Sequence, residues 1–374
     1  MNPFVTYRQQ LDVYQQAVAA GVSDADYVAL VEETDRSIRE VDGVGFEETP
    51  VQPLVIDGQP LTVKVETAAV GGSHKARHLF GLMIGLMLEE RMHPNHHVGE
   101  LAIASCGNAA LGAAVVARSV HRPLRVFVPT DANEFVLQRL GSLGATIEVC
   151  ERHDGQIGDP CIARLHESLA TGATPFTVQG TVAPGSIDGG RTLGLELADQ
   201  LRSANIEATD IYIQIGGGAL ATATMDGLLR GGYPLPRLHP VQARAAHPYV
   251  AAWNRLAGAV KGPLSRDAAA ALVAEHSEAM QPWPEPPVSV AHGILDDVTY
   301  DWQTVAVHQI CTGGYPILVD EAQLTAAAAA LEDLVSPPPD ETGAAGVAGW
   351  MADRRRSPDA VCVSLVTGAR REPV

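Results

Sequence analysis

The sequence predicts an α/β protein in which a parallel β-sheet is covered on both faces by helices, with a helical extension at the N-terminus. Two observations indicate this class. From residue 61 onward, short apolar segments alternate with longer helix-like segments, which is typical of parallel sheets. Residues 5–42 show only helical patterns. At 374 residues, the chain is long enough for two domains.

The N-terminal segment predicts two helices within residues 5–42. Ser23 and Asp26 stand at capping-box-like spacing before an apolar face, and Gly43 suits the end of the second helix. We therefore expect residues 1–45 to form a helical extension that packs on the body of the protein or on a partner subunit.

The alternating part of the chain predicts strands and helices in regular order. The predicted strands are the apolar segments 61–66, 101–105, 125–129, 146–150, 211–215 and 360–366. The predicted helices are 75–92, one that starts after Asn108, one that ends at Leu143, one that starts at Arg191, one that starts after Ala219, and two near 322–334 and 344–351. The proline-rich segments 281–287 and 337–339 predict loops.

Composition and charge narrow the class of protein. The net charge of −18 disfavours binding to nucleic acid or to an anionic membrane surface. No apolar run reaches the roughly 20 residues that cross a bilayer, and no basic segment followed by an apolar stretch predicts a secretory signal. Five cysteines without CxxC spacing indicate reduced thiols. We therefore predict a cytoplasmic protein.

The first chemically informative turn is Gly71–Arg77, between a predicted strand and a predicted helix. It carries Lys75, one of only three lysines in the chain. In open α/β sheets, ligands bind where strands end and helices begin. Lys75 is thus either a functional lysine or a surface lysine at a helix start, although a cation there opposes the helix dipole.

Two further turns share this geometry. In Ala104–Ala110, the Ser105 hydroxyl and the backbone amides are suited to hold a carboxylate, while the simpler interpretation makes Asn108 an N-cap. In Gly216–Leu220, consecutive glycines let amides converge on a phosphate, while the simpler interpretation is a flexible turn. The glycine run matches neither the Gly-Lys-Ser/Thr phosphate loop nor the dinucleotide fingerprint.

Together and in this order, the three turns resemble fold-type II pyridoxal-phosphate enzymes, which include threonine synthase, threonine and serine dehydratases, cysteine synthase and the tryptophan synthase β chain. The matching motifs are Ser73–Arg77, Ser105–Asn108 and Gly216–Ala219. The resemblance covers about residues 46–370. Further segments that resemble the family pattern are Glu48–Val51, Lys64–Glu66, Gly190–Leu197, Glu341–Gly346 and Thr367–Gly368.

The resemblance implies two open, mostly parallel twisted sheets flanked by helices, as in tryptophan synthase β. It implies a larger domain of residues 46–90 and 190–374 that binds pyridoxal 5′-phosphate and a smaller substrate-binding domain of residues 91–189, with residues 1–45 outside both. Members of this family are commonly homodimers, so we expect a homodimer that binds a small amino acid.

The resemblance also implies residue roles. Lys75 is the catalytic residue and holds the cofactor as a Schiff base, the internal aldimine. The other implied cofactor residues are Asn108, at the pyridoxal 3′-oxygen, the phosphate loop of Gly216, Gly217, Gly218, Ala219 and Leu220, and Thr367, which faces the pyridine nitrogen. The implied substrate residues are Ser105, Cys106, Gly107, Asn108 and Ala109.

Several positions depart from the family pattern. Ala219 replaces a glycine, which is acceptable if its φ stays negative. His74 precedes the lysine as in tryptophan synthase β, and His78 stands where many members have glycine. Val241–Ala243 resembles threonine synthase and lacks an acidic cation ligand, so we expect no metal site. His93, His96 and His97 form a rival metal candidate, which we interpret as a solvated loop without a nearby carboxylate.

The resemblance implies a lyase that eliminates a β- or γ-leaving group from a small amino acid, because the neutral Thr367 favours prompt expulsion of the group. Arg77, Arg152 or Arg191 are candidates to bind a substrate phosphate. The alternative is a β-replacement synthase, which the resemblance of His74 favours. A non-catalytic amino-acid-binding relative is a remote alternative, and a nicotinamide dehydrogenase lacks its spaced glycine fingerprint.

Overall fold

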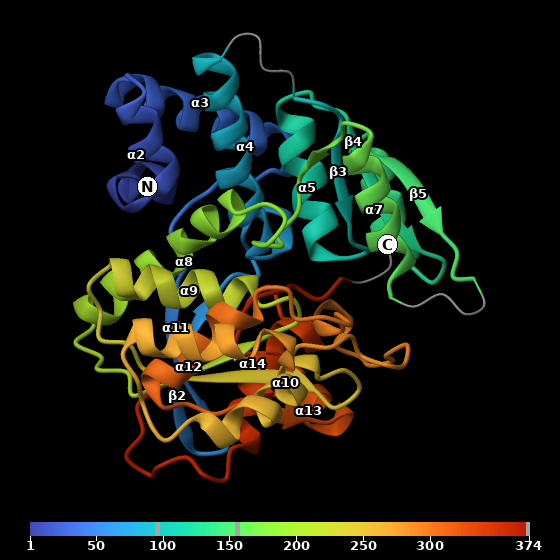
Figure 1. Ribbon diagram of the computed structural model, residues 1–374. Coiled ribbons are helices and arrows are strands. Elements are labelled where there is room, and N and C mark those ends of the chain that lie inside the picture. Colours follow the sequence, from blue (N-terminus) through green and yellow to red (C-terminus); the bar gives the residue numbers. More distant parts are fainter. Residues whose placement is uncertain (94–97, 154–157, 372–374) are drawn as a thin grey trace. The chain divides into compact units, whose positions relative to one another are not determined.

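The computed structural model describes residues 1–93, 98–153 and 158–371, which form two compact units (Figure 1). The first unit contains residues 1–48 and 69–192 together with Arg371, and the second contains residues 49–68 and 193–370. This division by compactness differs from the predicted functional domains. It does not assign ligand-binding roles, so the domain prediction stays a prediction.

The N-terminal extension of the first unit is helical. It contains α1 (Pro3–Thr6), the short 3-10 helix Arg8–Gln10, α2 (Asp12–Ala19) and α3 (Asp24–Asp42). The Ser23 Oγ accepts a hydrogen bond from the Asp26 amide at 3.1 Å, and Gly43 ends α3. Both predicted end signals are confirmed. The extension packs on the body of its own unit, where Phe4 contacts the ring of Phe80.

The sheet of the first unit has four parallel strands in the order β5-β4-β3-β6. The strands are β3 (Leu101–Ala104), β4 (Leu124–Pro129), β5 (Thr146–Cys150) and the short β6 (Thr174–Pro175). The helices are α4 (Lys75–Met92), α5 (Asn108–Ser119), α6 (Glu134–Ser142) and α7 (Pro160–Ala170). One face of the sheet is covered by α7, whose Leu165 packs with Ala102 and Phe127.

The sheet of the second unit has six strands in the order β1-β2-β10-β7-β8-β9. The strands are β1 (Val51–Ile56), β2 (Gln59–Val65), β7 (Asp210–Gln214), β8 (Arg237–Ala243), β9 (Ile317–Val319) and β10 (Cys362–Val366). The hairpin β1–β2 is antiparallel and the other neighbours are parallel. Two sheets, mostly parallel and flanked by helices, confirm the predicted fold class.

Helices cover both faces of the six-stranded sheet. They are α9 (Ala219–Arg230), α10 (Pro248–Leu256), α11 (Arg266–Glu275), α12 (Trp302–Thr312), α13 (Glu321–Leu331) and α14 (Glu341–Ala352), and α8 (Gly185–Ser203) runs from the first unit into the second. Alternate strand residues pack in opposite directions: Ile211 and Ile213 join the core under α9 and α12, while Tyr212 joins the core under α13 and α14. Apolar strands buried on both faces confirm the predicted layering.

Most predicted elements are found, with some differences. Helix α8 begins six residues before the predicted Arg191, and β1, β6, β8, β9, α7 and α10–α12 were not predicted. Strand β8 contains Pro240, and a proline inside an apolar segment argues against a strand. The remaining short helices are of the 3-10 type: Val70–Gly72, Ala257–Ala259, Ser277–Ala279 and His292–Ile294.

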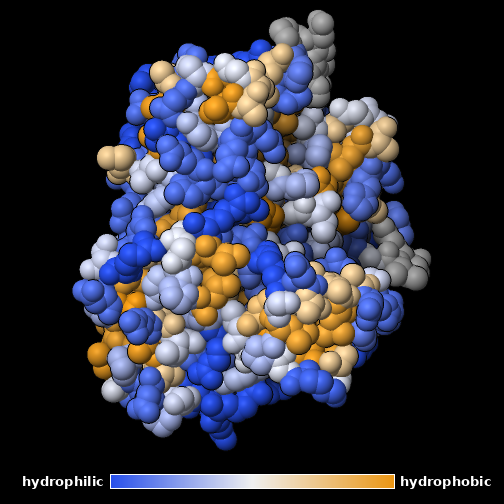
Figure 2. Space-filling view, turned by 60° about the vertical axis from the view of Figure 1, so that its left-hand side comes forward, coloured by the Kyte–Doolittle hydropathy of each residue, from blue (hydrophilic) through white to orange (hydrophobic). Residues whose placement is uncertain are grey.

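The described surface is mixed in character. Figure 2 shows hydrophobic residues in patches that are separated by hydrophilic residues. Within the described parts of the chain, no helix has the length and apolar character to cross a membrane.

Candidate active site

Lys75 lies at the start of a helix in the first unit. It is the first residue of α4, it is half-buried, and its amide donates to the Ser73 Oγ at 3.4 Å. The residue before it, His74, makes no side-chain capping bond to the helix. The lysine therefore stands directly after a small-residue turn, as predicted.

The Ser105–Ala109 loop lies in the same unit. Gly107 is the N-cap of α5, and Asn108 is the first residue inside the helix, so the interpretation of Asn108 as an N-cap is wrong. The Gly107 amide donates to the Ser105 Oγ at 3.4 Å. Cys106 is exposed, and Ala109 is buried. The Asn108 side chain is thus not needed to cap its own helix.

Close packing brings these two turns together. A Cβ at Gly112 of α5 would lie 3.2 Å from the Cα of Ala76, the neighbour of Lys75. A Cβ at Gly71 would lie 3.4 Å from the Cα of Gly112. Because glycine lets the two backbones approach, α5 holds the Asn108 loop next to the Lys75 turn. The first two predicted motifs therefore share one place in the fold.

Arg371, which the sequence did not single out, joins the same two turns. Its Nη2 donates to the Asn108 Oδ1 at 2.6 Å and to the Gly71 carbonyl oxygen at 2.8 Å. The guanidinium group of arginine carries several N–H donors and no acceptor, so it can bond two oxygen acceptors at once. No local pattern predicts this contact, because Arg371 and Asn108 are far apart in the chain.

Two buried histidines lie beside Lys75. The rings of His74 and His78 meet edge to face with centroids 5.8 Å apart. The Nδ1–H of His78 donates to the Ser186 carbonyl oxygen at 2.9 Å, because the carbonyl can only accept. Burial, followed by the charge of Lys75, lowers the pKa of His78 to about 3. His78 is therefore a neutral neighbour of the lysine at ordinary pH.

The glycine run lies in the second unit, where β7 gives way to α9. Gly218 is the N-cap of α9 and has a φ of +98°, a conformation that side chains rarely adopt. Ala219 and Leu220 are the first two helical residues, so Ala219 has the negative φ that was required of it. No side chain caps this helix start.

The helix start fits an anion in two respects. Its first amides point out of a helix of 12 residues, and such amides attract phosphate. The Thr222 hydroxyl, in the first turn, is buried and has no hydrogen-bond partner within the described residues. A buried hydroxyl normally has a partner, so this one is suited to a ligand.

One feature opposes an anion there. A Cβ at Gly216 would overlap the Asp296 carboxylate, and a Cβ at Gly217 would lie 3.2 Å from the Tyr300 ring. The Asp301 amide also donates to the Gly217 carbonyl oxygen at 2.8 Å. The segment 296–301 therefore packs directly on the glycine run, and its Asp296 places a negative charge beside the proposed phosphate loop.

Thr367 lies at the end of β10, also in the second unit. It is buried, its amide donates to the Gly343 carbonyl oxygen at 3.2 Å, and its Oγ1 accepts from the Gln214 Nε2 at 2.8 Å. Gln214 is the last residue of β7, two positions before the glycine run. Gln214 was not predicted, because its only signal in the sequence is a polar residue at the end of an apolar strand.

The Glu341–Gly346 motif begins α14. The Asp340 Oδ1 caps the helix by accepting from the Gly343 amide at 2.6 Å. Glycines three residues apart face the sheet, and a Cβ at Gly346 would lie 2.7 Å from the Ser364 Oγ. The glycines are thus required because α14 packs very closely on β7 and β10.

The Lys64–Glu66 motif forms a buried ionic network in the second unit. The Lys64 Nζ lies 2.7 Å from the Glu196 Oε2 and donates to the Thr49 carbonyl oxygen at 2.6 Å. The Thr49 hydroxyl bonds to Glu66. Buried charges need such partners, so we interpret these motif residues as structural.

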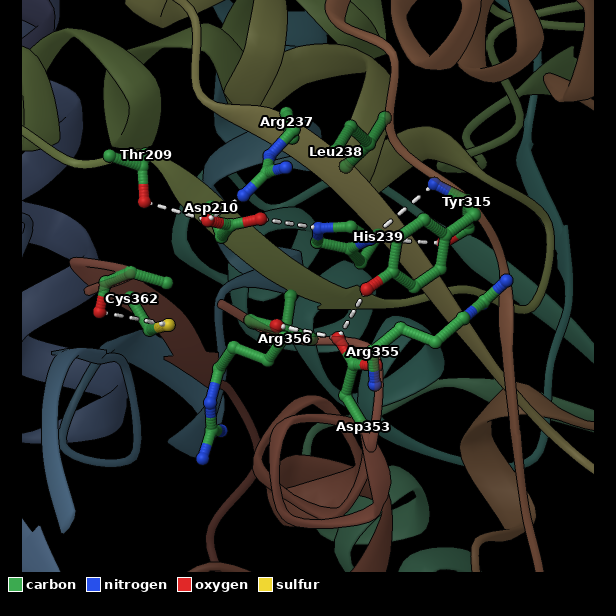
Figure 3. Close-up of polar contacts among 12 residues, drawn as sticks. Thr209, Asp210, Arg237, Leu238, His239, Tyr315, Asp353, Arg355, Arg356 and Cys362 are labelled. Carbon is green, nitrogen blue, oxygen red and sulfur yellow. Dashed lines mark hydrogen bonds and ion pairs between the residues drawn. The ribbon is translucent and has the colours of Figure 1, made fainter. Parts of the chain in front are cut away.

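A second charged cluster lies at the beginning of β7 and β8 (Figure 3). The Asp210 carboxylate contacts His239 Nε2 and Arg237 Nη2, each at 2.8 Å, and accepts from the Thr209 hydroxyl at 2.6 Å. Burial raises the pKa of Asp210, but these hydrogen bonds outweigh burial and hold it below its usual value. Ligands bind at the other ends of parallel strands, so this cluster is not a candidate active site.

The remaining predicted candidates are placed as follows. Arg191 contacts Asp12 and Asp188, and Arg77 donates to Thr192. His93 is exposed and its Nε2 lies 3.6 Å from a carboxylate oxygen of Glu89, so the expectation of no nearby carboxylate is wrong for His93. His96 and His97 lie outside the described residues. Within the described residues, no three His, Cys, Asp or Glu side chains are grouped to hold a metal ion.

Comparison with known proteins identifies the family. Residues 45–368 match the family model described as pyridoxal-phosphate dependent enzyme. The chain belongs to this family. The cofactor of the family is pyridoxal phosphate, as predicted, and the predicted resemblance to fold-type II enzymes is confirmed.

Individual relatives are more distant. A serine dehydratase-like protein of Rattus norvegicus is 26% identical over 197 residues, which are 53% of this chain and 55% of the relative. The chain thus matches about half the length of that relative. An L-serine dehydratase/L-threonine deaminase of Bos taurus is 24% identical over 77% of this chain and 84% of its own. The solved threonine deaminase isoform 2 of Solanum lycopersicum shares the fold, with a TM-score of 0.64, 16% identity and coverage of 94% of this chain and 91% of its own.

Proposed function

We propose that this protein is a pyridoxal-phosphate-dependent lyase that eliminates a β- or γ-leaving group from a small amino acid. The observation that carries the proposal is the packing of the Lys75 turn against the Asn108 loop through Gly112. That packing holds the start of α4, with the amine side chain of Lys75, close to the start of α5, with the amide side chain of Asn108. Relatives described as L-serine dehydratase/L-threonine deaminase support an elimination reaction.

When bound, the cofactor supplies an electron sink for the charge that develops at the substrate Cα. We assign to Lys75 the covalent attachment of the cofactor, and its free amine would accept the Cα proton of the substrate. The neighbouring His78 is neutral, so it adds no second positive charge beside this amine. A neutral amine can accept a proton, whereas an ammonium group cannot.

We assign the substrate carboxylate to the Ser105–Ala109 loop. The Ser105 hydroxyl and the amides of Gly107 to Ala109 stand at the start of α5, where the helix dipole favours an anion. The exposed Cys106 stands in the same loop. Holding the carboxylate here restricts rotation of the substrate and aligns the bond that breaks.

We assign the cofactor itself to Asn108, Thr367 and the start of α9. Asn108 would donate to the 3′-oxygen, and the amides of Gly216 to Leu220 at the start of α9, with the unpartnered Thr222 hydroxyl, would bind the phosphate. Thr367 would present a neutral hydroxyl to the ring nitrogen. Apart from Asn108, which belongs to residues 91–189, these assignments keep the predicted larger domain as the cofactor domain and residues 91–189 as the substrate domain.

The decisive experiment reduces the purified protein with borohydride in the presence of excess pyridoxal phosphate. We expect the yellow colour to be discharged and peptide mass spectrometry to find the pyridoxyl group on Lys75. An unmodified Lys75 would defeat the proposal. Serine, threonine, homoserine phosphate and acylated forms are then screened for release of ammonia and a 2-oxo acid.

β-Replacement is the second candidate, and the buried His74 before the lysine favours it. The same screen separates the two reactions when a thiol or indole is added. A lyase releases a 2-oxo acid with or without the nucleophile, whereas a synthase forms a new amino acid only with it. Light scattering of the holoenzyme tests the proposed homodimer.

A further inference from the structure

Gln214 makes three contacts through one nitrogen. Its side chain is buried, and its Nε2 lies 2.8 Å from the Thr367 Oγ1, 3.2 Å from the Gly343 carbonyl oxygen and 3.3 Å from the Thr342 carbonyl oxygen. The three acceptors come from the end of β10 and the start of α14. One amide group therefore organises the surroundings of Thr367.

The orientation of the Gln214 amide is determined by these neighbours. Carbonyl oxygens only accept hydrogen bonds, so the group that faces two of them must be the NH₂ group. The Oε1 then lies towards Gly346, where a Cβ would be 2.8 Å away. Within the described residues this buried oxygen has no hydrogen-bond partner, a costly arrangement that the NH₂ contacts offset.

The orientation of Gln214 determines what the Thr367 hydroxyl can do. Its oxygen already accepts a hydrogen bond from Gln214. The Gly343 carbonyl oxygen accepts from the Thr367 amide and from Gln214, so it has no lone pair to spare for the Thr367 hydroxyl. Among the described residues no acceptor takes the hydroxyl hydrogen, which is left for a ligand.

We propose that Gln214 is a positioning residue that makes the Thr367 hydroxyl a hydrogen-bond donor to the ring nitrogen of the cofactor. This inference rests on the proposed function. A donor at that nitrogen favours its unprotonated form, because a protonated nitrogen would need an acceptor instead. Gln214 thereby keeps the ring a weaker electron sink, which favours rapid loss of a leaving group.

The test compares Gln214→Met, which keeps the side-chain length and removes the donor, with Thr367→Val and the double variant. The readouts are the absorption spectrum of the bound cofactor, its pH dependence, and the dissociation constant for pyridoxal phosphate. We expect both single variants to shift the spectrum in the same direction and to weaken binding about fivefold, or about 1 kcal/mol. The double variant should add little, because the two residues act as one unit.

Gln309→Met is the matched control. Gln309 is equally buried in the same unit and accepts a hydrogen bond from the Tyr249 hydroxyl at 2.9 Å. This variant should lower the melting temperature and leave the cofactor spectrum unchanged. If Gln214→Met folds poorly, Gln214→Glu replaces it: its carboxyl group donates only when protonated, so its spectrum should approach that of the parent at acid pH.

A Gln214→Met holoenzyme with the parent spectrum and pH dependence would overturn the inference, as would fully additive effects of the two single variants. Failure of the proposed function is distinguishable, because the parent protein would then carry no reducible cofactor on Lys75. If the parent carries the cofactor there and Gln214→Met and Thr367→Val shift the spectrum in opposite directions, only the role of Gln214 is refuted.

Discussion

Arg371 donates a hydrogen bond from its Nη2 to the Oδ1 of Asn108 at 2.6 Å, although 263 positions separate the two residues in the chain. The contact occupies the amide oxygen of Asn108 with a guanidinium donor. The amide NH₂ group is therefore turned the other way, where it can donate to a ligand. This is the orientation that the proposed role of Asn108 at the 3′-oxygen requires.

Replacing Arg371 should therefore weaken the site without removing any proposed catalytic group. We expect Arg371→Met to raise the dissociation constant for pyridoxal phosphate about tenfold, because a charge-assisted hydrogen bond contributes about 1.5 kcal/mol. Arg371→Lys should recover part of this loss. Fluorescence titration of the apoprotein measures both, and equal affinities of parent and Arg371→Met would exclude the positioning role.

Lys75 should be indispensable for turnover. We expect Lys75→Ala to abolish product formation and to retain the far-ultraviolet circular dichroism of the parent, because Lys75 is only half-buried at a helix start. The control is Lys261→Ala, which removes an exposed lysine. Residual activity of Lys75→Ala above the level of an empty-vector preparation would contradict the assignment.

Asp296 should limit the affinity for the cofactor phosphate. Its carboxylate lies against Gly216, so removal of its charge by Asp296→Asn reduces repulsion of a phosphate anion. We expect binding of pyridoxal phosphate to tighten about fivefold, which corresponds to about 1 kcal/mol for one charge near a surface. Glu275→Gln, which removes the charge of an exposed residue at the end of α11, is the control. Weaker binding by Asp296→Asn would show that the carboxylate serves the cofactor.

The Asp210 cluster should make the free energy of unfolding fall as the pH becomes acidic. The pKa of Asp210 is lower in the folded protein than in the unfolded chain, so its stabilisation is present above the unfolded pKa and is lost as the pH falls towards the folded value. We expect Asp210→Asn to destabilise the protein by about 2 kcal/mol at pH 7, as for hydrogen bonds to a charged group. Urea unfolding at several pH values tests this: the difference between variant and parent should shrink below about pH 4.

Local signals explain why so much of the fold could be predicted. The helix Lys75–Met92 was predicted with its observed bounds, and Ser23 caps α3 as its spacing required. Helix ends and strand–turn–helix units depend on residues within a few positions of one another. The strand β8 was missed because it contains Pro240. Proline locally disfavours a strand inside a sheet, and here tertiary packing overrides that preference.

The sequence by itself determined the α/β class, the three small-residue turns and the family, because these depend on spacing along the chain. Only the tertiary structure decided which group each buried polar side chain bonds to. Asn108 does not cap its helix but bonds to Arg371, and Thr367 is met by Gln214. Such partners come from distant segments that packing brings together, and no periodicity along the chain records them.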